Sequence, residues 1–579
     1  MRSLGRTPAP ARVATLALAA SALVFCTAPR GLRAADDPPP PRTPLDRAVA
    51  TVTAGDLRSA LTFLAGDGLQ GRATGHAGSE LAARYLAAML GAAEAQPLAG
   101  SSLLQSIDLI TPAIGPDSHL TIKEQVRGAD VTARFTYGEH LHPAAVSPSR
   151  EVTAPVVFAG YGISAPAMNY DDYAGLDVSG RIVVVFDRTP TTGQTPDAFG
   201  NSTDEHGSLL VKARLAHARG AVGLLVVAPN GNRRLRSVGR TSTTVPSPRE
   251  RSFDLASNQL PIPVARISGQ AATAALGLDA RKTDLDALRD RLVKAAKSDT
   301  HPAAAAVASF AATNRVATLS TDVDQRPVAA YNVIGLVPGA DPVLSKEVIV
   351  VGAHFDHDGM DDEGRIYNGA DDNGSGTVGV LEVAEAVSRL IEAGERPRRS
   401  IVFALWNGEE RGLLGSRAFA ASTLPGGRTV VANLNMDMIG RDLEVPEGDD
   451  RFTGFAPTRP GQHTNTVMVL GYSRAPGLAQ LARDENRAIG LSLMVEGDTH
   501  AQNLLRRSDQ WPFLQRRIPA LFFTTGLHPD YHTPDDDVQK INFAKMEKIV
   551  RLVTRMTWHL ATAAAVPPFM DPAPESAAK

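Results

Sequence analysis

The last part of the chain repeats one pattern, a short apolar run of strand type followed by a stretch of helical type. The runs occupy residues 347–354, 400–407, 430–437, 466–472 and 519–526. The helical stretches occupy residues 377–392, 411–421, 476–489 and 542–564. Because apolar residues fill consecutive positions of each run, both faces of each strand must be buried. The alternation predicts an α/β fold in which a mostly parallel, twisted sheet is covered by helices on both faces.

Side chains of metal-ligand type lie at the ends of these runs, at the start of a helix, or in the last loop before the final helix. They stand in five contexts, VGAHFDHDG, NGADDNGSG, WNGEERG, NLNMDMIG and DYHTPDDD. The candidate ligands are His354, Asp371, Glu410, Asp437 and His532. Open α/β sheets place their ligand crevices outside the carboxyl ends of strands. We therefore expect these side chains to converge.

The types of these residues indicate a catalytic rather than a structural metal site. Imidazole and carboxylate ligands without thiolate suit zinc that keeps a position open for water. The single cysteine of the chain, Cys26, rules out a thiolate site. Two ions held at the usual separation of roughly 3.5–4 Å need a shared carboxylate. One His and one carboxylate for each ion plus one bridging Asp makes the five ligands found, so the sequence predicts two Zn²⁺ per chain.

Two further acids have expected catalytic roles. Glu409 precedes the ligand Glu410, and adjacent residues at a strand end point in different directions, so Glu409 can face a metal-bound water as general base. Asp356 lies two residues after His354 and is expected to accept the other N–H of that ligand imidazole.

The motifs HFDH, GADDNGSG, WNGEERGLLGS, NMDMIG and YHTPDD, in this order, resemble the di-zinc aminopeptidase family of peptidase clan MH. This family also contains glutamate carboxypeptidase and, without activity, the transferrin receptor. The resemblance covers most of residues 55–145 and 310–565 and implies a zinc-exopeptidase-like fold. It implies the five ligands named above, with Asp371 bridging, Glu409 as base, and a cis peptide bond between Asp371 and Asp372. No ligand position departs from the family pattern, which speaks against an inactive relative or a single-metal glutaminyl cyclase.

Several features also have simpler interpretations. A lone HxD or a pair of acids is usually a solvated surface, and only the joint occurrence in strand-end contexts favours a metal site. His357, His463, His500 and His528 lack a matching context, so we expect them to be solvated or satisfied, with His528 near the rim. Asp509 is expected to support the site from behind, the alternative being an ordinary helix cap. The GADDNGSG glycines are not followed by GK[ST], so they predict a tight turn rather than a phosphate loop.

An insertion interrupts the peptidase sequence. The GYGI turn, DYAGLDVSGRIVVV and KARLAHARGAVGLLVV resemble the protease-associated (PA) domain and place it at residues 150–275. The alternative is a structural lobe without contact to substrate. The remaining boundaries are a signal peptide at 1–34, a proline-rich spacer at 35–54, peptidase segments at 55–149 and 310–565, a linker helix at 276–309, and a disordered tail at 566–579.

The N-terminal segment indicates export. Arg2, Arg6 and Arg12 precede the apolar residues 13–25, which are too few to span a bilayer, so we expect a secretory signal that is cleaved after Ala34. The mature protein would then be secreted or periplasmic, with no stable membrane span and no cysteine for disulfides. A net charge of −3 gives no nucleic-acid footprint.

These inferences predict a secreted metallopeptidase that removes the N-terminal residue of peptides by attack of a metal-bound hydroxide. A carboxypeptidase or dipeptidase on the same scaffold, or a non-catalytic binding protein, are the alternatives. Peptides are the expected partners, and the sequence favours no particular oligomeric state.

Overall fold

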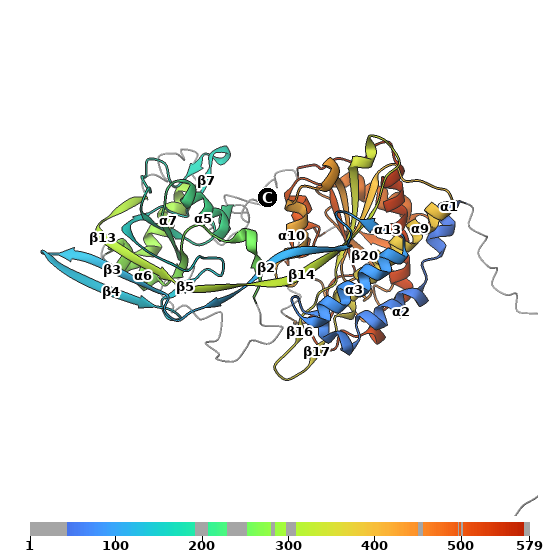
Figure 1. Cartoon of the computed structure of the whole chain (residues 1–579), viewed down its shortest axis with the longest axis horizontal. Coiled ribbons are helices and arrows are strands. Elements are labelled where there is room, and N and C mark those ends of the chain that lie inside the picture. The colour runs from blue at the N-terminus through green and yellow to red at the C-terminus, as the bar shows by residue number, and fades with distance from the viewer. Residues whose placement is uncertain are drawn as a thin grey trace, which may run out of the picture. The chain divides into compact units, whose positions relative to one another are not determined.

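The computed structural model describes residues 43–190, 206–228, 252–278, 284–296, 309–449, 455–495, 497–499 and 502–571. Two large sheets, one of ten and one of eight strands, organise these residues (Figure 1). The predicted signal peptide and its cleavage site lie outside the described residues, as do the proline run and His500.

The ten-stranded sheet is built around a parallel centre. In spatial order its central strands are β18 (Ser400–Trp406), β15 (Glu347–His354), β19 (Thr429–Met436) and β22 (Ala520–Thr524). All three contacts between these neighbours are parallel. On either side, β14 (Val323–Val337) and β20 (Thr466–Leu470) join antiparallel. The predicted α/β fold is confirmed, and the sheet is mixed rather than parallel throughout.

Four further strands complete the sheet. They are β1 (Gln96–Pro97), β2 (Leu104–Ile114), β11 (Asp254–Leu255) and β21 (Ser492–Met494). Two small hairpin pairs stand apart from both large sheets: β7 (Ser164–Ala165) with β8 (Tyr170–Asp171), and β16 (Gly359–Met360) with β17 (Ile366–Tyr367).

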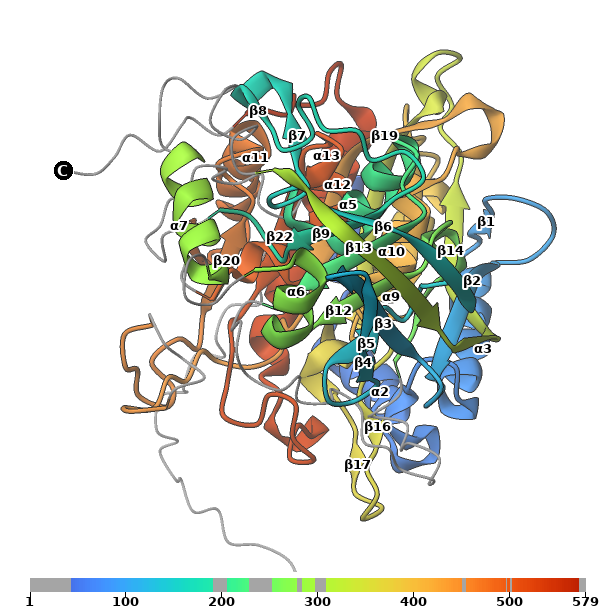
Figure 2. The same ribbon diagram turned by 90° about the vertical axis from the view of Figure 1, so that its left-hand side faces the viewer.

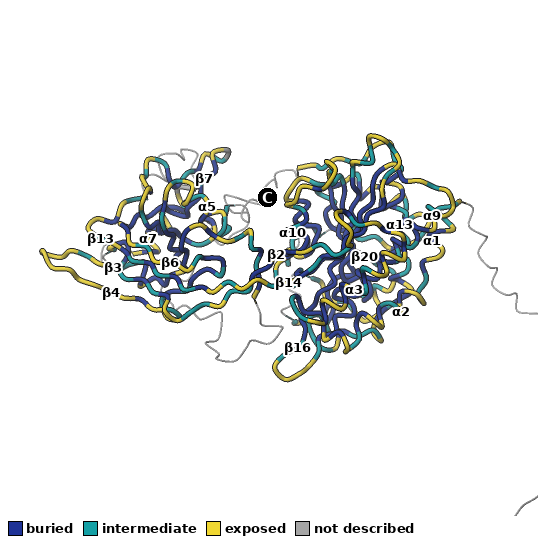
Figure 3. The backbone as a smooth tube through the Cα atoms, in the orientation of Figure 1, coloured by how far each residue is buried: buried dark blue, intermediate teal, exposed yellow. Residues whose placement is uncertain are grey.

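Helices cover both faces of the ten-stranded sheet, because alternate side chains of each central strand enter different apolar clusters. Ile349 and Val351 belong to one cluster, and Val348 and Val350 to the other. The first cluster is shared with α2 (Ala54–Leu64), α3 (Ala77–Ala92), α9 (Gly376–Glu392), α11 (Pro476–Asn486) and α13 (Phe543–Thr562). The second is shared with α10 (Leu414–Ala421) and α12 (Trp511–Gln515). Figure 3 shows the strands of this core in the buried colour.

The expected spacer at 35–54 is partly wrong, because it contains helix α1 (Pro44–Ala50). The helix begins with a capping box in which the Thr43 hydroxyl accepts from the backbone of Asp46 and the Asp46 carboxylate accepts in return. Ala48 and Val49 are buried. The capping box was overlooked in the sequence because it follows a proline-rich stretch.

The expected tail at 566–579 is also partly ordered. The Met570 N–H donates to the Arg474 carbonyl at 2.8 Å, and Asp571 pairs with Arg517. Residues 572–579 lie outside the described part of the chain.

The eight-stranded sheet contains the insertion and more. Its parallel strands are β6 (Arg150–Phe158), β9 (Ile182–Phe186), β10 (Gly223–Val227) and β12 (Val264–Ile267). Joined to them are β3 (His119–Val126), β4 (Ala129–Thr136), β5 (Leu141–Pro143) and β13 (Phe310–Thr321). Helices α5 (Leu209–Ala218) and α6 (Gly269–Leu276) pack on this sheet, which can be followed in Figure 2.

These pairings differ from the expected boundaries. Residues 119–143 and 310–321 were assigned to the peptidase segments 55–149 and 310–565, whereas their strands lie in the same sheet as those of the insertion. A strand pattern shows that a segment is extended and does not show its partner. The expected linker helix is α7 (Leu285–Ala296), whose Leu285, Leu288 and Leu292 enter the core of the second sheet.

The chain enters and leaves the eight-stranded sheet at neighbouring points. Strands β2 and β14 pair antiparallel up to Ile114 and Val323, and the Gly115 N–H donates to the Asp322 carbonyl at 2.8 Å. The ends of an inserted unit must lie close together, and here they are hydrogen-bonded neighbours.

Within the described residues, no helix combines the length and the apolar character needed to cross a bilayer.

We predict that replacing residues 116–321 by an Asn-Gly turn leaves a foldable peptidase sheet that lacks only the two-residue strand β11, because β2 and β14 then form a continuous hairpin. Replacing only residues 150–275 removes β6 and leaves β13 paired with β3 alone, with its other edge exposed, so that variant should aggregate. Circular dichroism and size-exclusion chromatography test both. A soluble, cooperatively unfolding 150–275 variant beside an insoluble 116–321 variant would contradict these boundaries.

Candidate two-metal site

Three neighbouring parallel strands deliver most of the candidate ligands to one edge of the ten-stranded sheet. His354 is the last residue of β15, Glu409 and Glu410 follow β18, and Asp437 follows β19. Because β15 lies between β18 and β19, their carboxyl ends meet. His532 comes from the loop after β22. The expected convergence at strand ends is therefore seen.

The first group of ligand-type atoms surrounds His354. Its Nε2 atom lies 3.4 Å from Oδ1 of Asp437 and 3.4 Å from Oδ1 of Asp372. The Ser508 hydroxyl donates to the other oxygen of Asp437 at 2.6 Å, which fixes that carboxylate. Burial alone would lower the pKa of His354, but Glu409 and Asp437 raise it well above the usual range.

The second group surrounds His532. Its Nε2 atom lies 3.0 Å from Oδ2 of Asp372 and 3.3 Å from Oε2 of Glu410. Burial would lower the pKa of His532, whereas Glu410 and Asp372 raise it to about 9. Asp372 thus stands between the two groups, with one carboxylate oxygen toward each histidine. Burial would raise the pKa of Asp372, yet the two histidines hold it well below its usual range.

Asp371 does not occupy the shared position that was expected for it. Its Oδ1 accepts the Gly440 N–H at 2.6 Å, and its Oδ2 lies 3.4 Å from Nε2 of the buried His528. The cis peptide bond joins Asp372 to Asn373, not Asp371 to Asp372. In the run Asp371–Asp372–Asn373 the sequence does not distinguish the two adjacent acids. In the structure, the carboxylate of Asp372 points toward the histidines of the two groups.

These residues fit a pair of zinc-type cations. Ligand atoms around a tetrahedral zinc at 2.0–2.1 Å stand about 3.3 Å apart, close to the separations within each group. Oδ2 of Asp372 and Oδ1 of Asp437 are buried and accept no hydrogen bond among the described residues. A buried acid without a donor is costly, and one cation in each group would satisfy these two oxygens.

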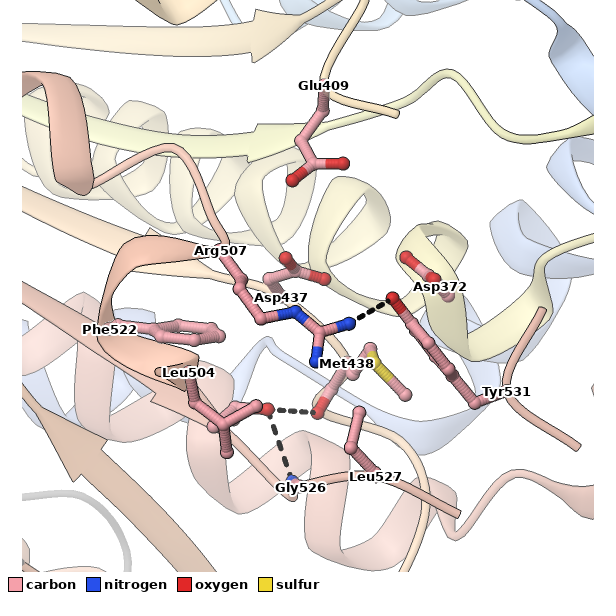
Figure 4. A pocket seen from close by; sticks show the side chains of 11 residues that line it. Asp372, Glu409, Asp437, Met438, Leu504, Arg507, Phe522, Gly526, Leu527 and Tyr531 are labelled. Carbon is pink, nitrogen blue, oxygen red and sulfur yellow. Dashed lines mark hydrogen bonds between the residues drawn. The ribbon is translucent and has the colours of Figure 1, made fainter. Parts of the chain in front are cut away.

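Glu409 lies beside the first group, with its carboxylate farther from His354 than those of Asp372 and Asp437. Its Oε2 is 3.8 Å from Nε2 of His354, and its carboxylate lines a pocket that also reaches Asp372 and Asp437 (Figure 4). Burial raises the pKa of Glu409 well above its usual range, and repulsion from Glu410 adds to this. This placement is compatible with a proton-transfer role.

Asp356 contacts the site differently from the expectation. Its Oδ1 is 3.9 Å from Nδ1 of His354, whereas the Asp356 backbone carbonyl is 3.1 Å from that nitrogen. The carboxylate instead accepts the backbone N–H of Glu409 at 3.1 Å and the Thr74 hydroxyl at 2.9 Å. Asp356 therefore fixes the backbone at Glu409.

Two further polar residues in the HFDHDG motif support the second group. The buried His357 lies with Nδ1 2.8 Å from Oε1 of Glu410, and Oδ2 of Asp358 lies 3.4 Å from Nδ1 of His532. His357 was expected to be solvated or satisfied, but it is buried, its Nδ1 contacts a candidate ligand, and its Nε2 has no hydrogen-bond partner among the described residues. Its position three residues after His354, in the same strand-end loop, was the available signal.

The remaining predicted residues lie around the site. Asp509 is fully buried near His354 and Asp437, and burial raises its pKa to about 7; its supporting role stays a prediction. His528 is fully buried and does not line a rim. His463 is half-buried, and its carbonyl accepts a hydrogen bond from Lys545.

The pocket beside Glu409 has an apolar wall and one cation. Met438, Leu504, Phe522 and Leu527 form much of its lining. Figure 4 shows the Arg507 guanidinium pointing to the Tyr531 hydroxyl, to which it donates at 2.9 Å.

Curated relatives match less than half of the chain. A probable leucine aminopeptidase of Arthroderma otae is 30% identical over 227 residues, which is 38% of this chain and 56% of that protein. Leupeptin-inactivating enzyme 1 of Streptomyces exfoliatus is 30% identical over 262 residues, covering 41% of this chain and 50% of that protein. The chain thus spans about half the length of these relatives.

Solved structures match over most of the chain at low identity. An aminopeptidase from Aneurinibacillus sp. strain AM-1 covers 91% of this chain and 97% of its own, with 18% identity and a TM-score of 0.45. A zinc aminopeptidase from Bacillus subtilis covers 90% and 99%, with 19% identity and a TM-score of 0.40.

Family models match part of each sheet. Residues 152–275 match the PA domain, in agreement with the predicted insertion at 150–275. Residues 332–557 match peptidase family M28 and include every residue of the two ligand groups. The chain is thus similar to peptidase family M28 over residues 332–557 and to the PA domain over residues 152–275.

Proposed function

We propose that this protein is a di-zinc exopeptidase that hydrolyses the N-terminal peptide bond of peptides. The observation that carries the proposal is Asp372, whose two carboxylate oxygens face His354 and His532 at 3.4 and 3.0 Å. Asp437 completes the first group and Glu410 the second. Each group then supplies one histidine and one terminal carboxylate, and Asp372 is shared, as a two-metal site requires.

The groups of the chain would divide the work as follows. Bound zinc would polarise the scissile carbonyl and lower the pKa of a coordinated water. Glu409 takes a proton from the attacking water and passes it to the leaving amine, which a carboxylate with a raised pKa can do near neutral pH. Asp356 holds the Glu409 backbone in place for this transfer. Ser508 keeps one oxygen of Asp437 occupied and so directs the other inward.

The pocket supports recognition of an amino terminus. Three carboxylates, those of Asp372, Glu409 and Asp437, line it and can attract an ammonium group. The apolar wall described above suits an aliphatic side chain of the first residue. The leucine aminopeptidases among the relatives agree with this proposal by name.

One observation favours a second candidate, a carboxypeptidase or dipeptidase. Arg507 lines the same pocket and could bind a substrate carboxylate. The neighbouring Arg506 instead stacks on Trp511 at 5.1 Å, and Arg411 lies 3.7 Å from Asp358. A non-catalytic binding role has less support, because both ligand groups and Glu409 are in place. Export to the periplasm or beyond stays a prediction of the N-terminal segment.

The first prediction concerns the metals. Purified protein should contain two zinc-type ions per chain, because two complete ligand groups share Asp372. Strong chelators should abolish peptidase activity, and added Zn²⁺ or Co²⁺ should restore it. Elemental analysis that finds one ion or none in fully active protein would refute the two-metal assignment.

The second prediction separates the base from its ligand neighbour. Glu409→Gln should keep both ions and lose typically 10²–10⁴-fold in kcat, because only proton transfer is removed. Glu410→Gln should lose metal from the His532 group. Metal content and kcat are measured on both variants. Unchanged turnover of a fully metallated Glu409→Gln protein would show that another group is the base.

The third prediction concerns the chain end. A peptide with an amidated carboxyl end should be cleaved, and the same peptide with an acetylated amino end should not, because the pocket acids need a free ammonium group. Mass spectrometry of the products identifies the bond. Cleavage of the acetylated peptide alone would establish the carboxypeptidase alternative, with Arg507 as the carboxylate-binding residue.

A further inference from the structure

A buried arginine joins the N-terminal segment to the ligand loops. Arg72 ends the short 3₁₀ segment Asp67–Arg72 between α2 and α3, and its side chain has no exposed surface. All of its hydrogen bonds go to main-chain carbonyls. They are Nε to Phe355 at 2.7 Å, Nη1 to Leu64 at 2.7 Å and to Asn368 at 2.6 Å, and Nη2 to Gly369 at 2.9 Å.

The acceptors are placed beside the metal-type ligands. Phe355 directly follows His354, and Gly369 lies three residues before Asp372. One planar guanidinium therefore fixes the backbone of the loop after β15 relative to the loop before α9. These are the two loops that carry His354 and Asp372, whose facing atoms are 3.4 Å apart.

The same short segment makes further contacts to both loops. The Thr74 hydroxyl donates to Asp356 at 2.9 Å, and the Asn368 amide donates to the Asp67 carboxylate at 2.8 Å. Gly71, with φ of +64°, lies so close to the carbonyls of Gly359 and Tyr367 that a Cβ atom there would be 2.4–2.5 Å from both oxygens. The segment is thus packed against the ligand loops without room for adjustment.

Burying a guanidinium is costly unless its donors are used and opposite charges are near. Burial lowers the pKa of Arg72 to about 10, while Asp356, Asp536 and Asp372 act in the opposite direction. Arg72 therefore stays charged at neutral pH. The positive charge of Arg72 does not attract a metal cation. Electrostatic attraction therefore does not explain why an arginine is buried beside the site. Its value to the site must lie in the hydrogen bonds.

We propose that Arg72 is a positioning residue that sets the spacing between His354 and Asp372 before any cation binds. The inference rests on the proposed two-metal function. It adds a residue that holds the ligand loops in place but lies far before the ligands in the sequence. Without the four carbonyl bonds, the two loops can move apart, and the first ligand group loses its preformed geometry.

Arg72→Lys tests the hydrogen bonds while keeping the charge. A lysine presents its donors from a single nitrogen and cannot span carbonyls on both loops. Zinc affinity, measured by competition with a chelating dye, should weaken about 10–100-fold, the usual effect of removing a group that orients metal ligands. At saturating zinc, kcat should also fall, with a smaller change in KM.

Arg399→Lys is the matched control. Arg399 is also buried, at 2% exposure, and donates to the carbonyls of Leu560, Ala563 and Ala564, but it precedes the amino end of β18, opposite the ligand edge. This variant should lower Tm without the roughly 10–100-fold loss of zinc affinity expected for Arg72→Lys. Equal losses of zinc affinity in the Arg399 and Arg72 variants would reduce Arg72 to general stability and overturn the proposal.

Thr74→Val provides a second variant should Arg72→Lys not fold. It removes the single bond to Asp356 at nearly constant volume and should lower kcat and zinc affinity in the same direction. Wild-type zinc affinity in whichever of these two variants folds would overturn the proposal. If the wild-type protein itself binds no zinc, the proposed two-metal function fails. This outcome differs from failure of the Arg72 proposal, in which the wild-type protein binds zinc and the variant binds it equally well.

Discussion

The parallel pairing of β18, β15 and β19 is the constraint on which the site depends. Register pairs join His354 to Trp406 and Gly352 to Asn435, so the three strands stop at nearly the same level. The residues that follow them must then share a small volume. This is why acids that are dozens of positions apart in sequence come within a few ångströms, and why the strands themselves are apolar on both faces.

Such convergence carries an electrostatic cost. Asp356, Asp437, Glu409 and Asp509 all have pKa values raised by burial, and several of these acids repel one another. Among the described members of the two ligand groups, Asp372 and Glu410 have lowered pKa values, because the histidines beside them outweigh the effect of burial. An arrangement of this kind is stable when cations are taken up, and it explains why so many backbone and hydroxyl donors are directed at the carboxylates.

Much of the fold could be predicted from the sequence because its signals are local. The run EVIVVGAH corresponds to β15 residue for residue, and the helical stretch 377–392 begins one position after α9 does. What failed depended on partners far along the chain. Nothing local shows that β13 pairs with β6, or that of two adjacent aspartates the second turns toward the histidines. Arg72 was missed for the same reason, since its acceptors are carbonyls, which any residue supplies.

The contacts of helix α1 have a consequence for how the protein is made. Asp46 pairs with Arg555, and the Val52 carbonyl accepts from Arg551, across separations of 509 and 499 residues. The first helix therefore cannot reach its place until the last one has been synthesised. The eight-stranded sheet needs no residue beyond β13 for its own pairing, so it can form while the rest is still emerging. Closure of the peptidase core is then a late, non-local and slow event, and the site does not exist before it.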